Sequence, residues 1–170
     1  MKWKEIATKS LNGKTEEMLP EYEKLYRNSL LKKHPFFLYN YGAELNYAEQ
    51  YARSTAILVV CQKKFNDYDL QMLLADNYEQ TGETELAIQQ FDRAANMIPC
   101  RFLPLYRIFK IYKQSDNIEK AKKYARLLVC KQIKIPSPTV KAIKLEAKKF
   151  LISLNSNFSA NLPPNTSSDY

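Results

Sequence analysis

The sequence predicts an all-α fold in which antiparallel helical hairpins stack as a solenoid and a final helix caps the C-terminal end. Its 170 residues include only 3 glycines and 8 prolines, and they are rich in Ala, Leu, Lys, Glu and Gln, which favours helix. The pattern around Gly82 also recurs along the chain, with a period of about 34 residues. A period of this length with two helices per unit is typical of solenoids, whose units bury their apolar faces against their neighbours.

The repeat is defined by turn residues and small residues. Gly82 lies between two helical stretches, where glycine ends a helix because it reaches left-handed backbone angles without a steric penalty. Asp116 takes its place one period later, and aspartate tolerates the same backbone. Small residues are needed where the two helices of a hairpin approach closely. The residues that we expect there are Gly42, Ser54, Ala75 and Ala87.

We expect a single domain over residues 1–154. Residues 1–34 resemble a degenerate hairpin, with a turn at Asn12 and Gly13. The apolar residues of its second helix are Tyr22, Leu25, Tyr26 and Leu30. Three repeats follow, at residues 35–67, 68–101 and 102–135.

A cap helix is expected over residues 137–154. Ser137 is a suitable N-cap residue and Pro138 suits the first helical position. The apolar stripe of this helix consists of Val140, Ile143, Ala147, Leu151 and Leu154. The composition of residues 155–170 predicts a disordered tail.

The unit from Tyr68 to Arg101 has a characteristic order and spacing of small, aromatic and turn residues: Leu74, Ala75, Tyr78, Gly82, Ala87, Phe91, Ala94 and Pro99. In these residues it resembles the tetratricopeptide repeat (TPR), with Gln71 in place of the usual tryptophan. The resemblance implies a right-handed superhelical solenoid that binds protein partners in the groove lined by its first helices.

Four segments carry a narrower resemblance: FFLYNYGAELN (36–46), YDLQMLLADNYEQTG (68–82), MIPCRFLPLY (97–106) and KIPSPTV (134–140). They are similar to the soluble C-terminal repeat region of O-antigen ligase or polymerase-like membrane proteins of Bacteroidetes, which act in lipopolysaccharide biosynthesis. That resemblance implies a bacterial accessory domain, tethered to the inner membrane in a longer protein. The glycan chemistry of that family is attributed to a multi-pass membrane part that this chain lacks, so no catalytic residue is carried over.

The sequence gives little indication of a membrane span, an export signal or a disulfide framework. The longest apolar run, Ala56 to Cys61, has six residues, whereas a spanning helix needs about 18 or more. The N-terminus carries basic residues without an apolar signal region. An odd number of cysteines without CxxC spacing favours buried free thiols in a reducing compartment. We therefore expect a soluble domain on the cytoplasmic side.

Catalytic and cofactor motifs are also missing. His34 is the one histidine and precedes Pro35 at a hairpin boundary, so a solvated loop residue is favoured over a metal ligand or catalytic base. The sequence contains no phosphate-binding glycine loop, nucleophile elbow or zinc-protease motif. Carboxylate pairs such as Asp76 with Glu79 are more typical of solvated helix surfaces. We expect neither a cofactor nor a metal, and no enzyme activity from this chain alone.

The groove positions that the TPR resemblance implies run from aromatic through acidic to basic. We expect them to bind a peptide or helix of unknown identity, although each tyrosine has an alternative role in packing against the next repeat. The candidate groove residues are Tyr39, Asn46, Tyr47, Asp69, Met72, Asp76, Glu79, Tyr106, Lys110 and Lys113.

Charge is distributed unevenly along the chain. Residues 35–100 contain 4 basic and 9 acidic side chains, and residues 101–150 contain 14 and 3. A basic patch is expected at Lys120, Lys123, Arg126, Lys141, Lys144 and Lys148. It is suited to an anionic membrane or glycan surface, while a solvated lysine face is the commoner case. Nucleic acid is disfavoured because aromatic residues do not interleave regularly with the basic ones.

These observations favour a monomeric, non-catalytic protein-interaction module, serving as the accessory domain of an O-antigen ligase-like membrane protein. Two alternatives remain open: a free-standing cytosolic scaffold, and a module that docks on an anionic surface through its basic C-terminal third.

Overall fold

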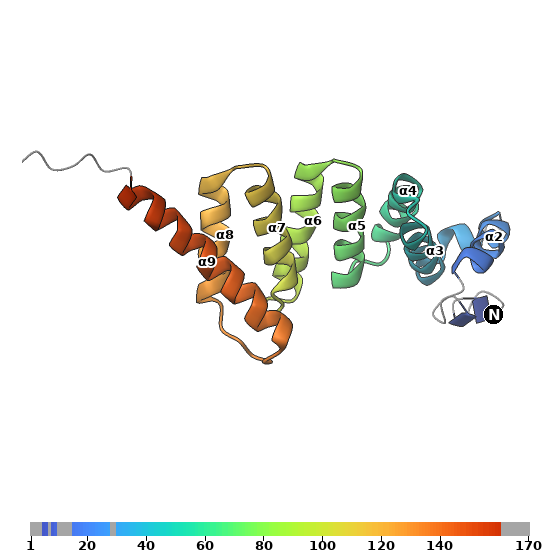
Figure 1. Ribbon diagram of the computed structural model, residues 1–170. Helices are drawn as coiled ribbons and strands as arrows, with labels where there is room; N and C mark the ends of the chain where they lie inside the picture. Colours follow the sequence, from blue (N-terminus) through green and yellow to red (C-terminus); the bar gives the residue numbers. More distant parts are fainter. Residues whose placement is uncertain (1–4, 7, 10–14, 28–29, 161–170) are drawn as a thin grey trace, which may run out of the picture. The chain divides into compact units, whose positions relative to one another are not determined.

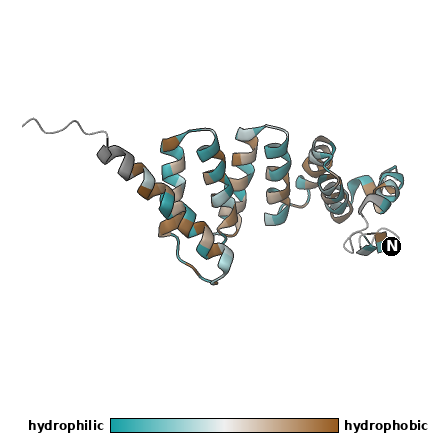
Figure 2. Ribbon diagram, in the orientation of Figure 1, coloured by the Kyte–Doolittle hydropathy of each residue, from teal (hydrophilic) through white to brown (hydrophobic). Residues whose placement is uncertain are grey.

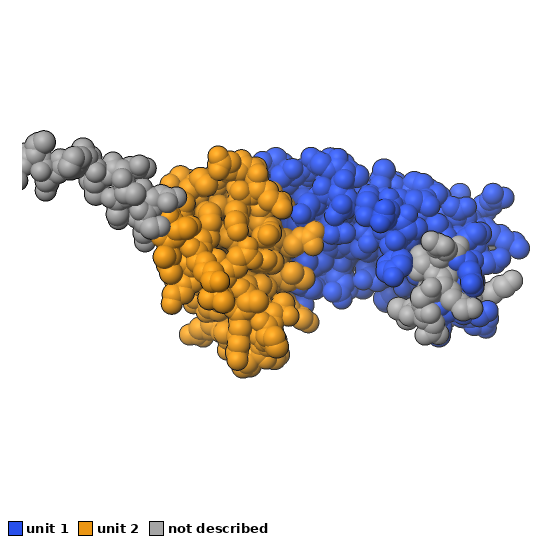
Figure 3. Space-filling view, viewed as in Figure 1, with its two compact units in different colours: residues 1–99 blue, residues 100–170 orange. Residues whose placement is uncertain are grey.

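A computed structural model describes residues 5, 6, 8, 9, 15–27 and 30–160 (Figure 1). All of the regular elements in this described part of the chain are helices, as the composition predicts. The chain divides into two compact units, residues 1–99 and 100–170, shown in separate colours in Figure 3. A single domain over residues 1–154 stays a prediction.

Unit 1 contains two complete hairpins, α3 with α4 and α5 with α6, which follow the helix α2. Its elements are α2 (Thr15–Tyr26), the 3-10 turn η1 (Leu31–Lys33), α3 (Pro35–Tyr47), α4 (Tyr51–Gln62), α5 (Tyr68–Gln80) and α6 (Thr84–Met97). The turn that was predicted at Asn12 and Gly13 lies outside the described residues. Leu30, assigned by the sequence to the second helix, lies beyond the end of α2 and is 80% exposed.

Unit 2 is one hairpin followed by a long helix: α7 (Leu103–Gln114), α8 (Ile118–Cys130) and α9 (Pro138–Ala160). The hydroxyl of Ser137 accepts a hydrogen bond from the amide of Val140 (3.1 Å), so this residue caps α9 as predicted. The boundary predicted at residue 154 is wrong, because α9 continues to Ala160. Residues 155–160 contain neither glycine nor proline that would end the helix.

A residue in the left-handed conformation ends the first helix of each hairpin. Glu49, Gly82 and Asp116 have φ angles of 58°, 81° and 53°, which confirms the predicted backbone at Gly82 and Asp116 and adds Glu49. One residue further on, the amide donates to the carbonyl five residues back, which is the Schellman motif. These bonds join Gln50 to Leu45 (2.8 Å), Glu83 to Tyr78 (2.8 Å) and Asn117 to Tyr112 (3.0 Å).

The small residues lie in the core, as predicted. Gly42 and Ser54 in the first hairpin and Ala75 and Ala87 in the second are buried. A Cβ atom added to Gly42 would lie 2.4 Å from Cδ2 of Leu58, far inside van der Waals contact. The absence of a side chain at Gly42 is therefore what lets α3 approach α4 so closely.

Each unit has its own apolar core. In unit 1, Tyr22 of α2 lies between rings of α3 and is fully buried, with ring centroids 5.8 Å from Tyr41 and 5.9 Å from Phe37. In unit 2, Phe109 of α7 is fully buried and meets Phe150 of α9 edge to face at 5.3 Å. Aromatic contacts thus join α2 to α3 and α9 to α7.

Two sequence-based assignments need correction. His34 is half-buried, and its Nδ1 accepts a hydrogen bond from the amide of Phe37 (3.2 Å), so it caps α3 instead of lying in a solvated loop. Cys61 is buried as expected, but Cys100 and Cys130 are exposed because they lie where α6 and α8 give way to loops. No helix in the described ranges is both long and apolar enough to cross a membrane.

The left-handed turns predict a stabilising substitution. Glu49 has a φ angle of 58°, and this conformation costs a side-chain-bearing residue about 1 kcal/mol relative to glycine. We expect Glu49→Gly to raise the free energy of unfolding, measured by urea denaturation, by about 1 kcal/mol. Gly82→Ala is the matched control and should lower the free energy of unfolding by a similar amount, because alanine is strained in the left-handed backbone. A steric clash adds nothing to this cost, since an added Cβ meets no atom within 4 Å. A loss of stability in Glu49→Gly would contradict the assignment of strain to this turn.

Candidate functional site

The predicted groove residues of unit 1 lie on the first helices α3 and α5. These residues are Tyr39, Asn46, Tyr47, Asp69, Met72, Asp76 and Glu79. Together with the neighbouring Phe36 of α3, we call them the first-helix face of unit 1. Asn46 of α3 bridges to α5, because its side-chain amide donates to Oδ2 of Asp76 (3.2 Å) and to Oδ1 of Asn77 (2.8 Å). Asn46 and Asp76 therefore hold neighbouring repeats together, in addition to any contact with a ligand.

The Asn46 bridge continues into a buried polar chain that sequence reasoning missed. Nδ2 of Asn77 donates to the hydroxyl of Ser54 (2.8 Å), and this hydroxyl donates to the carbonyl of Gly42 (2.7 Å). Both Asn77 and Ser54 are fully buried. The chain links α3, α4 and α5 through polar side chains inside the core, where an unsatisfied group would be costly. The sequence signal available for this polar chain was Asn77, which lies close to the small residue Ala75 in an otherwise amphipathic helix.

At the N-terminal end of α3, aromatic rings cluster around Phe65, which lies in the loop before α5. Its ring centroid is 5.2 Å from that of Phe36 and 6.0 Å from that of Tyr39. Tyr39 is half-buried, and burial, followed by the negative charges of Asp69 and Asp67, raises the pKa of its hydroxyl to about 12. The role of this tyrosine in packing, left open by the sequence, is thus present in the structure.

Exposed members of this face lie at the ends of its helices. Phe36 and Tyr47 are 53% and 74% exposed, and Asp69 is exposed in the first turn of α5. Met72 and Glu79 are half-buried. The face therefore offers two aromatic side chains on α3 and a carboxylate on α5 to solvent.

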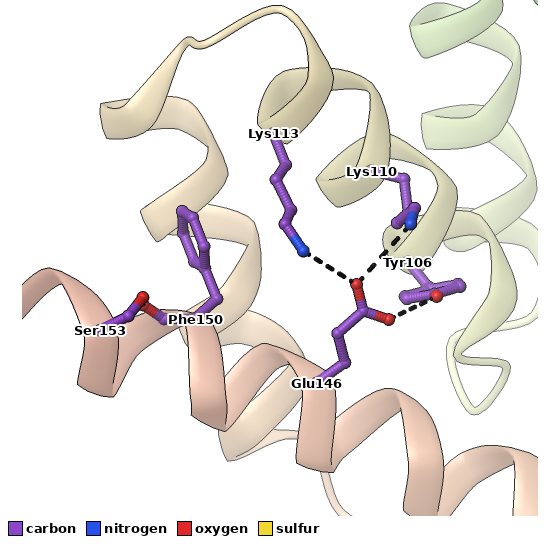
Figure 4. Close-up of polar contacts among 6 residues, drawn as sticks. All are labelled: Tyr106, Lys110, Lys113, Glu146, Phe150 and Ser153. Atoms are coloured by element: carbon purple, nitrogen blue, oxygen red, sulfur yellow. Dashed lines mark hydrogen bonds and ion pairs between the residues drawn. The ribbon is translucent and has the colours of Figure 1, made fainter.

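In unit 2, the predicted groove residues of α7 converge on one carboxylate of α9 (Figure 4). The hydroxyl of Tyr106 donates to Oε2 of Glu146 at 2.6 Å. Nζ of Lys113 donates to Oε1 of the same residue at 3.2 Å, and Nζ of Lys110 lies 3.7 Å from it. The structure thus brings Tyr106, Lys110 and Lys113 together around Glu146, which we call the Glu146 cluster.

The electrostatics of the Glu146 cluster favour an ionised carboxylate. Burial alone raises the pKa of Glu146, but the hydrogen bonds from Tyr106 and Lys113 and the charges of both lysines outweigh it, so the pKa lies below its usual value. The hydrogen bond to Glu146, together with burial, raises the pKa of Tyr106 to about 12. At neutral pH the ionised carboxylate of Glu146 is therefore held by the neutral hydroxyl of Tyr106 and by the side chains of Lys110 and Lys113.

Helix α9 packs on the preceding hairpin, mainly against α8. Glu146 bonds to α7 much as Asp76 bonds to α3, and in both cases an acidic residue meets a groove position near the end of the preceding first helix. Glu146 was not among the predicted site residues. It interrupts a lysine-rich helix of which it is the one acidic residue, and this was the available signal.

The residues of the predicted basic patch differ in the contacts that they make. Lys120 and Lys123 on α8 lie over rings of their own unit, 5.0 Å from the centroid of Tyr112 and 5.8 Å from that of Tyr124. Lys144 is half-buried and donates to the carbonyl of Lys131 (2.7 Å). The side chains of Arg126, Lys141 and Lys148 are exposed. Lys141 and Lys144, grouped on one face by the sequence, thus have different surroundings, because Lys144 lies nearer the side of α9 that packs.

No group of histidine, cysteine or carboxylate side chains within the described ranges is arranged to hold a metal ion. The polar clusters around the predicted groove residues are an amide and hydroxyl chain in unit 1 and an ion-paired carboxylate in unit 2. The exposed aromatic rings and charged side chains near them offer contacts to another molecule.

Comparisons with known proteins show the fold. The C-terminal part of a TPR repeat-containing protein from Cytophaga hutchinsonii matches with a TM-score of 0.68 at 19% identity; the alignment covers 91% of this chain and 62% of that one, so this chain spans less than two thirds of its length. MamA matches with a TM-score of 0.66 at 14% identity, covering 91% of this chain and 96% of MamA. No protein-family model and no curated protein matches the sequence. The chain has the all-α helical-repeat solenoid fold of these structures.

The buried polar chain predicts a structural role for Asn77. Asn77→Ala removes a donor and an acceptor from the core and leaves Ser54 and Asn46 with fewer partners. We expect it to lower the free energy of unfolding by about 2 kcal/mol in urea denaturation. Asn96→Ala, on the exposed side of α6, is the control and should change it by less than about 0.5 kcal/mol. Equal effects of the two substitutions would show that the chain adds nothing to stability.

The Glu146 cluster predicts a shift in the titration of Tyr106. In Glu146→Gln the hydroxyl of Tyr106 loses its charged acceptor, so its pKa should fall from about 12 towards the usual value for tyrosine. The titration is followed by NMR of labelled tyrosine. Glu119→Gln on α8 is the control and should leave the pKa of Tyr106 in place. An unchanged pKa in Glu146→Gln would contradict the geometry.

The lowered pKa of Glu146 also fixes the sign of a pH effect. A carboxyl whose pKa is lower in the folded than in the unfolded state stabilises the fold above its unfolded pKa of about 4.5, and this stabilisation is lost as the pH falls through the folded value. Glu146→Gln should therefore cost about 1 kcal/mol at pH 7, because the pair is partly exposed, and less in acid. A loss of stability in Glu146→Gln that is larger in acid than at pH 7 would contradict the lowered pKa of Glu146.

Proposed function

We propose that the chain is a non-catalytic module that binds a peptide or protein segment on the first-helix face of unit 1. The observation that carries the proposal is the exposure of two aromatic side chains on one helix. Phe36 and Tyr47 are 53% and 74% exposed and lie eleven residues apart on α3, about 16 Å along the axis. Aromatic side chains of this kind are frequent anchors in protein interfaces, since they supply a large contact area at a small cost in entropy.

Neighbouring charges define the complementary partner. Between Phe65 and Asp92 the sequence has no lysine or arginine, and the acidic residues of α5 belong to the first-helix face. A partner segment with apolar side chains at a spacing of about 16 Å and basic residues beside them would therefore fit. Helix-in-groove recognition of this type relies on a few apolar anchors with polar flanks.

Selection from a displayed library of random peptides, with the purified chain as bait, tests this proposal. The double variant Phe36→Ser/Tyr47→Ser should lose at least about tenfold in affinity for the enriched peptides, as expected when two aromatic anchors are removed. The matched control is Val59→Ser/Val60→Ser, because these valines are exposed on the second helix α4 of the same unit. Failure to enrich any peptide, or an equal loss in both double variants, would reject the face as a binding site.

The narrower assignment, to an accessory domain of an O-antigen ligase-like membrane protein, is supported by the four sequence segments at 36–46, 68–82, 97–106 and 134–140. An antibody against this domain would test it in fractionated source cells. A band in the membrane fraction well above the 19.9 kDa of this chain would support the assignment. A soluble band at the mass of this chain would leave the alternative of a free-standing scaffold. The other alternative, docking on an anionic surface, would involve basic side chains of unit 2 and not the first-helix face of unit 1.

A further inference from the structure

The outward side of α9 combines apolar and basic residues without a carboxylate. Leu145 and Ile152 are 54% and 57% exposed, and Lys141 and Lys148 are exposed between and before them. At about 100° per residue these four side chains lie within roughly 60° of one another around the helix axis, and they extend over about 16 Å. We call them the α9 stripe. Figure 2 shows hydrophobic and hydrophilic positions alternating along this helix.

The opposite side of α9 is the one that packs. Ile143 and Ala147 are buried, and Phe150 contacts Phe109 of α7. Glu146, the single acidic residue of α9, is held on this side by α7. The α9 stripe therefore lies on the side of α9 away from the buried residues Ile143 and Ala147, and no acidic residue on that side of the helix offsets its charge.

We propose that the α9 stripe docks unit 2 on an anionic lipid membrane, with Leu145 and Ile152 entering the interface and the lysines contacting the headgroups. Charge complementarity supports this occupant: residues 101–150 contain 14 basic and 3 acidic side chains, and Glu146 is already paired. Basic amphipathic helices bind membrane surfaces through the sum of apolar burial and attraction to anionic lipids.

The chemistry of the α9 stripe favours lipid over other anionic partners. Lysine is depleted at the centre of protein interfaces, where aromatic residues and arginine are enriched, whereas a lysine can keep its charge at a membrane surface while its alkyl chain covers apolar surface. The stripe has no aromatic side chain on which a base could stack. This inference does not depend on the peptide site of unit 1.

Co-sedimentation of the whole chain with phosphatidylglycerol vesicles, and with phosphatidylcholine vesicles for comparison, tests the proposal at low salt. We expect binding to the anionic vesicles alone. Lys141→Gln/Lys148→Gln should weaken it about 10- to 30-fold, since each lysine near an anionic surface contributes about 5-fold. Leu145→Ser/Ile152→Ser should weaken it by at least about 10-fold at unchanged charge, because the apolar contribution is lost.

The matched control is Lys123→Gln/Arg126→Gln on α8, which removes the same charge from a different helix of unit 2 and should weaken binding less than about 5-fold. All of these side chains are exposed, so circular dichroism should show the same helix content in every variant. Absence of vesicle binding would overturn the proposal. Equal losses of vesicle binding from the basic double variants on α8 and α9 would also overturn it. So would binding to poly-glutamate or single-stranded RNA that is as strong as vesicle binding and is unchanged in Leu145→Ser/Ile152→Ser.

Discussion

The left-handed residue between the two helices of each hairpin is the constraint on which the rest of the structure depends. At Glu49, Gly82 and Asp116 the chain leaves the first helix through a Schellman motif, and the second helix returns beside it. Only after this reversal can small residues such as Gly42 and Ser54 let the two helices approach closely. The repeat period is therefore visible in the sequence where a residue that tolerates this backbone, such as Gly82 or Asp116, occupies the turn.

Polar side chains then fix neighbouring helices where apolar packing alone would leave their register open. In unit 1 the chain from Gly42 through Ser54 and Asn77 to Asn46 ties three helices together inside the core. In unit 2, Glu146 plays the corresponding part at the surface of α7. Residues that a repeat pattern assigns to ligand binding thus have a structural role, and the side chains left for binding are the exposed ones at the helix ends.

This division separates the two surfaces proposed here. Phe36 and Tyr47 on α3 are more than half exposed, and the same is true of Leu145 and Ile152 on α9. One surface has acidic neighbours and the other basic ones, so they suit partners of opposite charge. Surface chemistry of this kind can change while the helical repeat stays the same.

The sequence by itself determined the all-α class, the repeat period, the turns at Gly82 and Asp116 and the cap at Ser137, because each depends on local backbone preference or helical periodicity. Only the tertiary structure decided which polar residues bind and which hold helices together. Asn46, Tyr106 and Lys113 are groove positions by pattern, but their partners Asn77 and Glu146 lie 31 to 40 residues away. The strain at Glu49 and the extension of α9 to Ala160 were also missed, since glutamate does not mark a left-handed turn and a polar composition does not by itself end a helix. Local rules fix local geometry, whereas the pairing of distant side chains depends on how the helices pack.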